Sequence, residues 1–294
     1  MQSLTSAIII TYNPNVDVLK SNVTNLLASS FIKEIIIVDN GSLNSLDDLK
    51  NIKNVMIEYL GSNQGIATAQ NVGLQIVQKN FSRFALLLDQ DSEIESELVG
   101  KLINGFHELS RSGYKIAAVG PRPFDLFEDK KMKPRIQRDK AISNNFSITK
   151  QIIASGKLIN MDALSKIGMM DDDLFIDGVD HEWCWRAGKY GFTIAIIENA
   201  VMRHRLGDGR GKFLGVTYKI GSPVRLYYQF RNILLLSRRS YVPLYWKVRC
   251  LVGMVLRFII FSLNEKDSKI RRYYMIKGIV SGLRKDKGII DKMY

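Results

Sequence analysis

Short apolar runs recur along the first two hundred residues, and most of them end in polar side chains or glycine. Continuous apolar runs of this length are typical of strands buried on both faces, as in a parallel sheet. The expected strands lie near 7–10, 33–39, 55–59, 84–89, 115–120, 152–159 and 192–197, and expected helices cover about 15–29, 95–111 and 177–189, with another beginning near 63. This alternation predicts an α/β fold with a mostly parallel sheet flanked by helices.

The chain has 294 residues, of which 46% are hydrophobic, which is enough for one large domain or one domain with an appendage. Its two cysteines, Cys184 and Cys250, provide no disulfide framework, and the N-terminus enters a strand without a secretory signal. No apolar stretch is long and uncharged enough for a transmembrane helix. We therefore expect a cytoplasmic protein.

The apolar run from Phe84 to Leu88 leads directly into Asp89-Gln90-Asp91, two carboxylates one residue apart. In open α/β sheets, ligands bind at the carboxyl ends of the strands, where these side chains would lie. Mg²⁺ usually takes only one or two protein carboxylates and completes its shell with phosphate oxygens and water. The pattern predicts a metal–diphosphate site at Asp89 and Asp91, although two surface aspartates at a turn would give the same pattern.

Asp39 ends another apolar run and allows two interpretations. It either accepts hydrogen bonds from backbone N–H groups of a turn, or accepts the N3–H of a uracil or thymine base that Thr11 and Tyr12 flank. Asn63 and Gly65 begin a segment of small residues, which allows either close helix–sheet packing or the approach of a nucleotide to the backbone. No Walker or dinucleotide-binding pattern is present.

Three carboxylates, those of Asp177, Asp180 and Glu182, fall within six residues at the start of a predicted helix. Acidic residues in a first helical turn often cap the helix, and here they could also pair with Arg186. Alternatively, a carboxylate beside the tryptophans of this segment would have a raised pKa and act as a general base. His204 lies among basic residues and glycines that suit a diphosphate, either as a structural residue or as a further metal ligand.

Basic residues are concentrated near the end of the chain. Residues 201–294 contain 21 Lys and Arg but only 5 Asp and Glu, in a chain of net charge +13. Helices with basic and aromatic residues are expected at about 225–239, 244–263 and 268–285. They favour either in-plane binding to an anionic membrane or packing on the core or a second subunit. No nucleic-acid-binding motif accompanies the charge, so we expect no nucleic-acid partner.

Five motifs follow one another in a fixed order: Thr11-Tyr12-Asn13, Val38-Asp39-Asn40-Gly41-Ser42, the Asn63 to Gly73 segment, Asp89-Gln90-Asp91, and the Asp180 to Arg186 segment. Together they resemble glycosyltransferase family 2, inverting transferases with the Rossmann-like GT-A fold, over about residues 4–210. Two further segments, Phe175 to Arg186 and Arg225 to Asn232, are similar to those of bacterial rhamnosyltransferases. Those enzymes use dTDP-L-rhamnose to build O-antigen or other cell-wall polysaccharide.

The resemblance implies a role for each matching residue. The residues that would bind the nucleotide sugar are Thr11, Tyr12, Asn13, Asp39, Asn63, Gly65, Asp89, Gln90, Asp91 and His204, with Asp39 on the pyrimidine base. Asp89, Asp91 and His204 would hold Mg²⁺ or Mn²⁺. Asp180 would be the catalytic base. The family's usual Glu-Asp pair has Val179 at its first position here, which leaves Asp177 or Glu182 as helper or base.

The implied reaction moves L-rhamnose from dTDP-L-rhamnose to a hydroxyl of a saccharide, itself carried on a polyprenyl-diphosphate lipid. A UDP-sugar donor, or a non-catalytic scaffold at the membrane surface, is the alternative. Residues 1–220 would form the catalytic domain, with a nucleotide-sugar half to about 120 and an acceptor half after it. Residues 221–294 would bind the inner face of the cell membrane or form a homo-oligomer.

Overall fold

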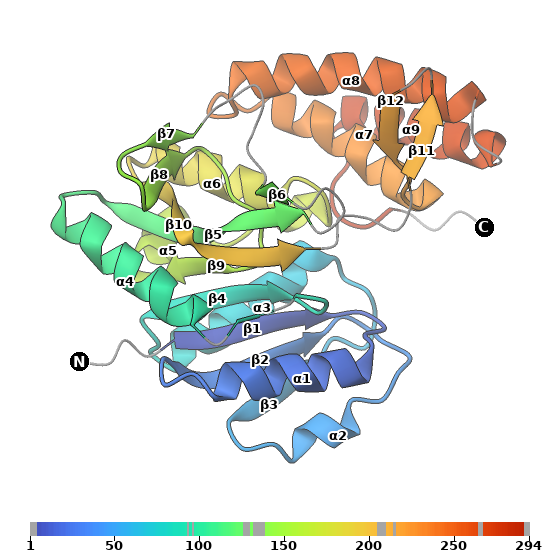
Figure 1. Ribbon diagram of the computed structural model, residues 1–294. Helices are drawn as coiled ribbons and strands as arrows, with labels where there is room; N and C mark the ends of the chain where they lie inside the picture. The colour runs from blue at the N-terminus through green and yellow to red at the C-terminus, as the bar shows by residue number, and fades with distance from the viewer. Residues whose placement is uncertain are drawn as a thin grey trace.

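The protein is described here from a computed structural model, which covers residues 5–92, 94–95, 97–125, 130–131, 139–204, 210–213, 216–263 and 267–290. One large sheet runs through the centre of the molecule, with helices on both of its faces (Figure 1). Its strand order is β3-β2-β1-β4-β9-β5-β10-β8-β7, with β6 paired to β5. The predicted α/β architecture is confirmed.

The first half of the sheet is entirely parallel, as predicted. Helical crossovers connect its strands, which is the usual way to join parallel neighbours. Its strands are β1 (Thr5–Thr11), β2 (Ile32–Asp39), β3 (Val55–Tyr59) and β4 (Phe84–Asp89), and its helices are α1 (Val16–Leu27), α2 (Asp47–Lys50), α3 (Ile66–Lys79) and α4 (Leu98–Arg111).

The second half of the sheet is mixed, which departs from the predicted parallel arrangement. β5 and β10 are parallel, but β9 runs antiparallel to both β4 and β5. In the described part of the chain no helix lies between β5 and β9, so no helical crossover of the usual kind brings β9 into the sheet parallel to β5. The elements are β5 (Ile116–Asp125), β6 (Lys130–Lys131), β7 (Lys140–Ala141), β8 (Phe146–Thr149), β9 (Lys157–Asn160), α5 (Met161–Ile167), η1 (Asp172–Leu174), α6 (Val179–Lys189) and β10 (Thr193–His204).

Two apolar cores cover the two faces of the sheet. Successive side chains of a strand point to opposite faces, so Ile9 and Leu88 pack with α1 and α4, whereas Ile8 and Leu87 pack with α3, α5 and α6. Burial on both sides explains why these strands read as continuous apolar runs in the sequence. The polar residues that follow the runs are left at the carboxyl edge of the sheet.

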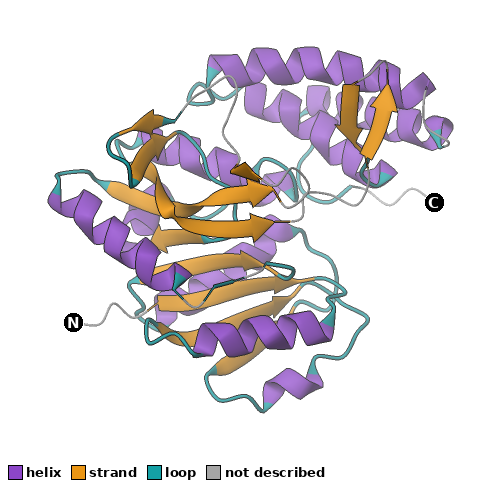
Figure 2. Ribbon diagram, viewed as in Figure 1, coloured by secondary structure: helices purple, strands orange, loops and turns teal. Residues whose placement is uncertain are grey.

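Three helices form a layer beyond the sheet (Figure 2). They pack around a small core of their own, formed by Leu226, Phe230, Phe261 and Met275. A two-stranded hairpin precedes them. The elements are β11 (Arg210–Phe213), β12 (Val216–Lys219), α7 (Pro223–Ser237), α8 (Leu244–Leu263) and α9 (Ser268–Arg284). The domain division near residue 220 stays a prediction.

Candidate active site

Asp39 lies at the carboxyl edge of the sheet, where β2 ends beside β1. Its carboxylate accepts hydrogen bonds from Thr11 Oγ1, at 3.0 Å, and from the backbone N–H and hydroxyl of Ser42. Only 3% of Asp39 is exposed, so its remaining acceptor capacity lies at a narrow opening. Asp39 therefore accepts hydrogen bonds from its own turn, as the first interpretation predicts. These hydrogen bonds hold the carboxylate in one orientation.

Gln90 joins the ends of β1 and β4. Its side-chain oxygen accepts from the backbone N–H of Tyr12 at 2.7 Å, and its amide nitrogen donates to the Tyr12 carbonyl at 3.3 Å. Asn13 joins the end of β1 to the loop after β2, since its side chain accepts a hydrogen bond from the backbone N–H of Leu43 at 2.8 Å. Gln90 and Asn13 thus shape the site through the backbone, whereas the Tyr12 ring stays half exposed.

Asn63 and Gly65 serve packing more than ligand approach. Asn63 Oδ1 accepts from the side chain of Asn40 and from the backbone N–H of Gly65. Gly65 has φ +89°, and a Cβ at this position would lie 2.5 Å from the Phe175 ring. The glycine therefore lets the segment before the catalytic helix pack against the start of α3, which is the packing alternative that the sequence left open.

Three carboxylates converge at the end of β4. The negative charges of Asp180 and Asp91 act together with burial to raise the pKa of Asp89 to about 7, and burial makes the largest contribution. Asp180 comes from the first turn of α6, more than ninety residues away in sequence, and its side chain is 27% exposed. Asp180 therefore lies near the strand end that carries Asp89, since Lys157 contacts Asp180 and pairs with Leu87 of β4. The roles predicted for these residues stay predictions.

A fully buried lysine, which sequence reasoning missed, lies beneath this cluster. Lys157 Nζ is 3.5 Å from Asp180 Oδ1 and 3.3 Å from the Asp180 carbonyl, and its positive charge lowers the pKa of Asp89. It also lies over the Trp183 ring, 5.9 Å from the centroid. No feature of the sequence indicates that Lys157 is buried near a carboxylate, because a single lysine in an apolar run is also typical of an edge strand.

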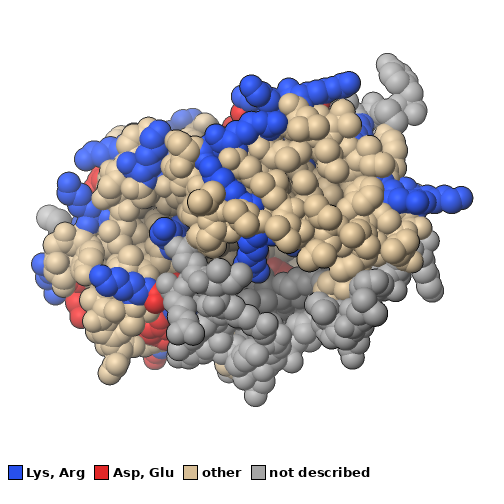
Figure 3. All heavy atoms as spheres, turned by 90° about the horizontal axis from the view of Figure 1, so that it is seen from above, with Lys and Arg blue, Asp and Glu red and all other residues tan. Residues whose placement is uncertain are grey.

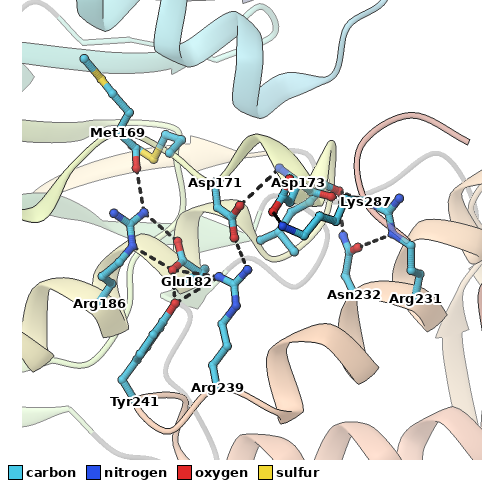
Figure 4. A network of polar contacts seen from close by, with 12 residues as sticks. Met169, Asp171, Asp173, Glu182, Arg186, Arg231, Asn232, Arg239, Tyr241 and Lys287 are labelled. Atoms are coloured by element: carbon cyan, nitrogen blue, oxygen red, sulfur yellow. Dashed lines mark hydrogen bonds and ion pairs between the residues drawn. The ribbon is translucent and has the colours of Figure 1, made fainter. Parts of the chain in front are cut away.

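Glu182 belongs to the framework rather than to the open site (Figure 4). It is fully buried, and Arg186 binds both of its oxygens at 2.9 Å. The Tyr241 hydroxyl donates to it at 2.5 Å, and Arg239 lies 3.1 Å away. Burial, followed by the bond to Glu182, raises the pKa of Tyr241 to about 12. These donors occupy both Glu182 oxygens, which favours a structural role, and the predicted role of Glu182 as helper or base stays a prediction.

Asp177 is also engaged, though less completely. Arg225 binds both of its carboxylate oxygens, at 2.8 and 2.9 Å, and the Asp177 side chain remains 21% exposed. Its backbone has φ +64°, a left-handed conformation that Asp tolerates better than most residues. Its predicted role as a catalytic helper stays a prediction.

The segment between η1 and α6 is fixed by two buried side chains of α7. Arg231 donates to the carbonyls of Asp173 and Leu174, and Asn232 donates to those of Leu174, Ile176 and Asp177. These bonds explain the Arg225 to Asn232 motif. It recognises the loop that leads into the helix carrying Asp180.

The metal site has two candidate ligands in the described residues. Among these residues, no group of three or more His, Cys, Asp or Glu side chains is arranged to hold a metal ion. Asp89 and Asp91 fit an ion that completes its shell with phosphate oxygens. Burial first, and then the charges of Asp180 and Asp91, raise the pKa of Asp89. The side chain of His204 lies outside the described residues, so its predicted role as a ligand stays a prediction.

Comparison with known proteins identifies the family. Residues 6–176 match the model of "Glycosyl transferase family 2". The chain is 34% identical over 300 residues to the dTDP-rhamnosyl transferase RfbF of Shigella flexneri, covering 98% of this chain and 97% of that protein.

Solved structures of low sequence identity show the same fold. GalNAc-T7 with UDP, GalNAc and Mn²⁺ has a TM-score of 0.61 at 14% identity, covering 96% of this chain but only 56% of that one. The mannosyltransferase PcManGT from Pyrobaculum calidifontis, with GDP-Man and Mn²⁺, has a TM-score of 0.57 at 10% identity over 95% of this chain and 86% of that one. S. aureus TarS residues 1–349 have a TM-score of 0.54 at 16% identity, over 95% and 80%. The chain belongs to glycosyltransferase family 2 and has the GT-A fold.

Proposed function

We propose that the protein is an inverting, metal-dependent transferase that moves L-rhamnose from dTDP-L-rhamnose to a saccharide hydroxyl in bacterial polysaccharide synthesis. The observation that carries the reaction type is the convergence of Asp89, Asp91 and Asp180 at one strand end. The donor is proposed from the similarity to the dTDP-rhamnosyl transferase, which extends over nearly the whole chain. A UDP-sugar donor is the alternative that a ligand panel distinguishes.

The nucleotide would lie across the ends of β1 and β2. Asp39 is held by Thr11 and Ser42, which leaves one acceptor position for the N3–H of thymine or uracil. The exposed ring of Tyr12 can cover the base from the side of β1. Each of these contacts is available to a pyrimidine of either kind, which is why the base alone does not select dTDP over UDP.

Asp89 and Asp91 would hold Mg²⁺ or Mn²⁺ against the diphosphate. When bound, the ion neutralises the charge that develops on the departing nucleotide diphosphate. Because the carboxylates repel one another in its absence, ion binding also relieves the repulsion that raises the pKa of Asp89.

Asp180 would take the proton from the acceptor hydroxyl as that oxygen attacks the anomeric carbon. The C–O bond to the acceptor forms as the bond to the diphosphate breaks, and attack from the opposite face inverts the centre, as in an inverting glycosidase. Lys157 holds the Asp180 side chain from below through a 3.5 Å contact and keeps it directed to the open side. The loop fixed by Arg231 and Asn232 sets the position of this helix.

The acceptor and the place of action are proposed from the surface of α8. Apolar side chains repeat every three or four residues along α8, so they form one stripe on its outer side. The stripe consists of Leu244, Val248, Leu251, Val252, Val255, Leu256, Ile259 and Leu263, each at least 36% exposed. Seen from above, much of the described surface carries no charged side chain, and Lys and Arg lie around these uncharged areas (Figure 3).

This α8 stripe fits in-plane binding to an anionic membrane, where a lipid-linked acceptor would be presented. Phe261 is the only buried residue among the described residues of α8, so most of the apolar surface of this helix does not pack into the protein core. In the described part of the chain, no helix is long and apolar enough to cross a membrane. We therefore propose a peripheral association with the cytoplasmic face, and a homo-oligomer is the competing use of the same stripe.

The donor is tested by thermal unfolding with dTDP, UDP, GDP and dTDP-rhamnose, each with and without Mn²⁺. A ligand that binds only the folded state raises the melting temperature by mass action. Metal-dependent stabilisation by dTDP compounds that is lost in Asp91→Ala supports the proposal. A response to UDP alone moves the donor to a UDP-sugar, and the absence of any nucleotide response favours a non-catalytic scaffold.

The membrane proposal is tested by flotation with vesicles that contain or lack anionic lipid. Val252→Glu with Val255→Glu places two charges in the stripe, whereas Leu43→Glu changes another exposed apolar residue far from it. We expect the double variant to lose binding to anionic vesicles and Leu43→Glu to keep it. A dimer in solution that the double variant abolishes, without any vesicle binding by wild type, would assign the stripe to a subunit interface.

A further inference from the structure

A small pocket lies near the first turn of α6, with His181 in its lining. Its volume is about 240 Å³, below the range of roughly 300–1,000 Å³ typical of sites for drug-sized ligands, so it suits a single sugar ring. The polar lining residues are Arg122, Asp139, Gln151, Ser155 and His181. His181 directly follows Asp180 in the sequence, and the other polar lining residues come from other segments of the chain.

The cation in this pocket's lining, Arg122, is already paired with two carboxylates. Arg122 is 2% exposed and binds Asp139 at 2.8 Å and Glu198 at 2.9 Å, the latter through Nε. An incoming carboxylate or phosphate would have to displace one of these acidic partners. The remaining walls include Ile152, Ile153 and the adjacent prolines of β5, which can contact the C–H face of a ring. These features select an uncharged ligand with one apolar face.

Two polar side chains in the lining, those of His181 and Gln151, can form further hydrogen bonds. Among the described residues, none forms a hydrogen bond with the His181 imidazole, whose centroid lies 5.8 Å from that of the Trp185 ring. Gln151 Oε1 accepts from the Trp185 indole N–H at 3.0 Å, which leaves the Gln151 amide nitrogen without a described acceptor. Burial lowers the pKa of His181 to about 4, so at neutral pH the ring offers one donor and one acceptor.

We propose that this pocket binds an uncharged pyranose ring of the acceptor, with His181 and the Gln151 amide as its hydrogen-bonding groups. The inference rests on the proposed function for the identity of the ligand as an acceptor. His181 of the lining follows Asp180 on α6, so the pocket adjoins the helical turn that carries the proposed base. On the other side, Ser155 bonds to Ser92 at 2.5 Å, and Ser92 in turn accepts from the Asp89 N–H.

Ligand-observed saturation-transfer NMR tests the pocket without relying on catalysis. The probes are neutral methyl glycosides of rhamnose, glucose, galactose and N-acetylglucosamine, with methyl glucuronide as the charged comparison. The samples contain full-length protein, dTDP and Mg²⁺. We expect at least one neutral glycoside to bind and the glucuronide not to bind.

Three variants locate that binding. His181→Phe removes the hydrogen bonds but keeps a ring, and should weaken the affinity about three- to tenfold, as expected for one neutral hydrogen bond. Ile153→Trp fills the pocket and should abolish the signal. His107→Phe is the matched control, since His107 lies on α4 outside the pocket, and it should bind as wild type does. Thermal melts show which variants are folded.

The outcomes separate this inference from the proposed function. A dTDP-induced rise in melting temperature with no binding of any neutral glycoside overturns the pocket and leaves the transferase standing. Glycoside binding that survives Ile153→Trp, or equal binding of the glucuronide, also overturns it. Binding that depends on His181 and Ile153 in a protein that ignores dTDP supports the pocket and rejects the proposed donor.

Discussion

Two groups of carboxylates lie side by side in this protein and have opposite surroundings. The active-site carboxylates, Asp89, Asp91 and Asp180, face one another, with Lys157 as the cation that contacts Asp180. The framework carboxylates are Asp171, Asp173 and Glu182, which pair with Arg239, Lys287 and Arg186 respectively (Figure 4). Asp180 and Glu182 are two residues apart on one helix but belong to different groups.

The difference shows what the C-terminal helices contribute. The cations that neutralise Asp171 and Asp173, and one of the two that neutralise Glu182, come from the region after residue 230. For that region the sequence left membrane binding and packing on the core or a second subunit as alternatives. Some of the basic residues of this region therefore form ion pairs within the molecule. Carboxylates left without such partners remain available to a metal ion and a substrate.

The largest expected effect comes from Asp180→Asn, which removes the proposed base while preserving shape. Loss of general-base catalysis typically costs about 10²- to 10⁴-fold in rate. We expect that loss in the initial rate of dTDP release from dTDP-rhamnose, with the dTDP-induced melting shift unchanged. If Asp180→Asn keeps wild-type activity, Asp180 is not the base, and the distinction between active-site and framework carboxylates fails.

Glu182→Ala should act on stability instead. Removing one partner of a buried ion pair leaves Arg186 without its carboxylate, and such a loss typically costs about 3–5 kcal/mol in the free energy of unfolding. Urea unfolding measures this loss, with Glu95→Ala, an exposed glutamate before α4, as the control for removing a charge. If Glu182→Ala melts like wild type but loses catalysis, Glu182 belongs with the active-site group after all.

How much of this division the sequence could predict depends on distance along the chain. Asp89-Gln90-Asp91 follows its own strand, so both its place at the sheet edge and its chemistry can be predicted locally. Glu182 and Asp180 are locally equivalent, because both are acidic residues in one first helical turn. Arg186, four residues after Glu182, is a local partner that the sequence offers, whereas Arg239 and Tyr241, more than fifty residues later, complete the enclosure of Glu182.

Long-range contacts also explain the other differences. Gly65 faces Phe175, and Lys157 faces Asp180, through contacts that no local pattern encodes. The antiparallel direction of β9 was missed for a similar reason, since its apolar run resembles that of a parallel strand. By contrast, β3 and β4 end where predicted, because the change from apolar to polar residues marks the sheet edge directly.

A third test uses pH to measure the repulsion among the active-site carboxylates. In the metal-free folded protein the pKa of Asp89 is about 7, above its ordinary 3.8, so the folded state keeps a proton that the unfolded chain releases. Stability should therefore fall as pH rises from about 4 to 7, by roughly 4 kcal/mol, and level off above 7. Melts of wild type and Asp89→Asn across this range give the contribution of Asp89 by difference.

The control for this pH test is Asp48→Asn, which removes an exposed carboxylate on α2. Its stability should run parallel to that of wild type. Saturating Mg²⁺ should flatten the dependence of wild type, because a bound cation favours the ionised carboxylate. Identical pH dependence of wild type and Asp89→Asn would mean that the three carboxylates do not interact as their positions indicate.

The smallest expected effect concerns Asp177, which stands between the two groups. It is paired like a framework carboxylate, yet the Arg225 side chain that binds it is half exposed, and exposed pairs contribute only about 0.2–1 kcal/mol. Asp177→Asn keeps the left-handed backbone, since Asn also tolerates φ +64°. We expect its melting temperature to fall by a few degrees at most and its rate of dTDP release to stay within severalfold of wild type. A loss of a hundredfold, as for Asp180→Asn, would instead show that Asp177 assists the base, and that pairing with a solvent-exposed arginine does not remove a carboxylate from the active-site group.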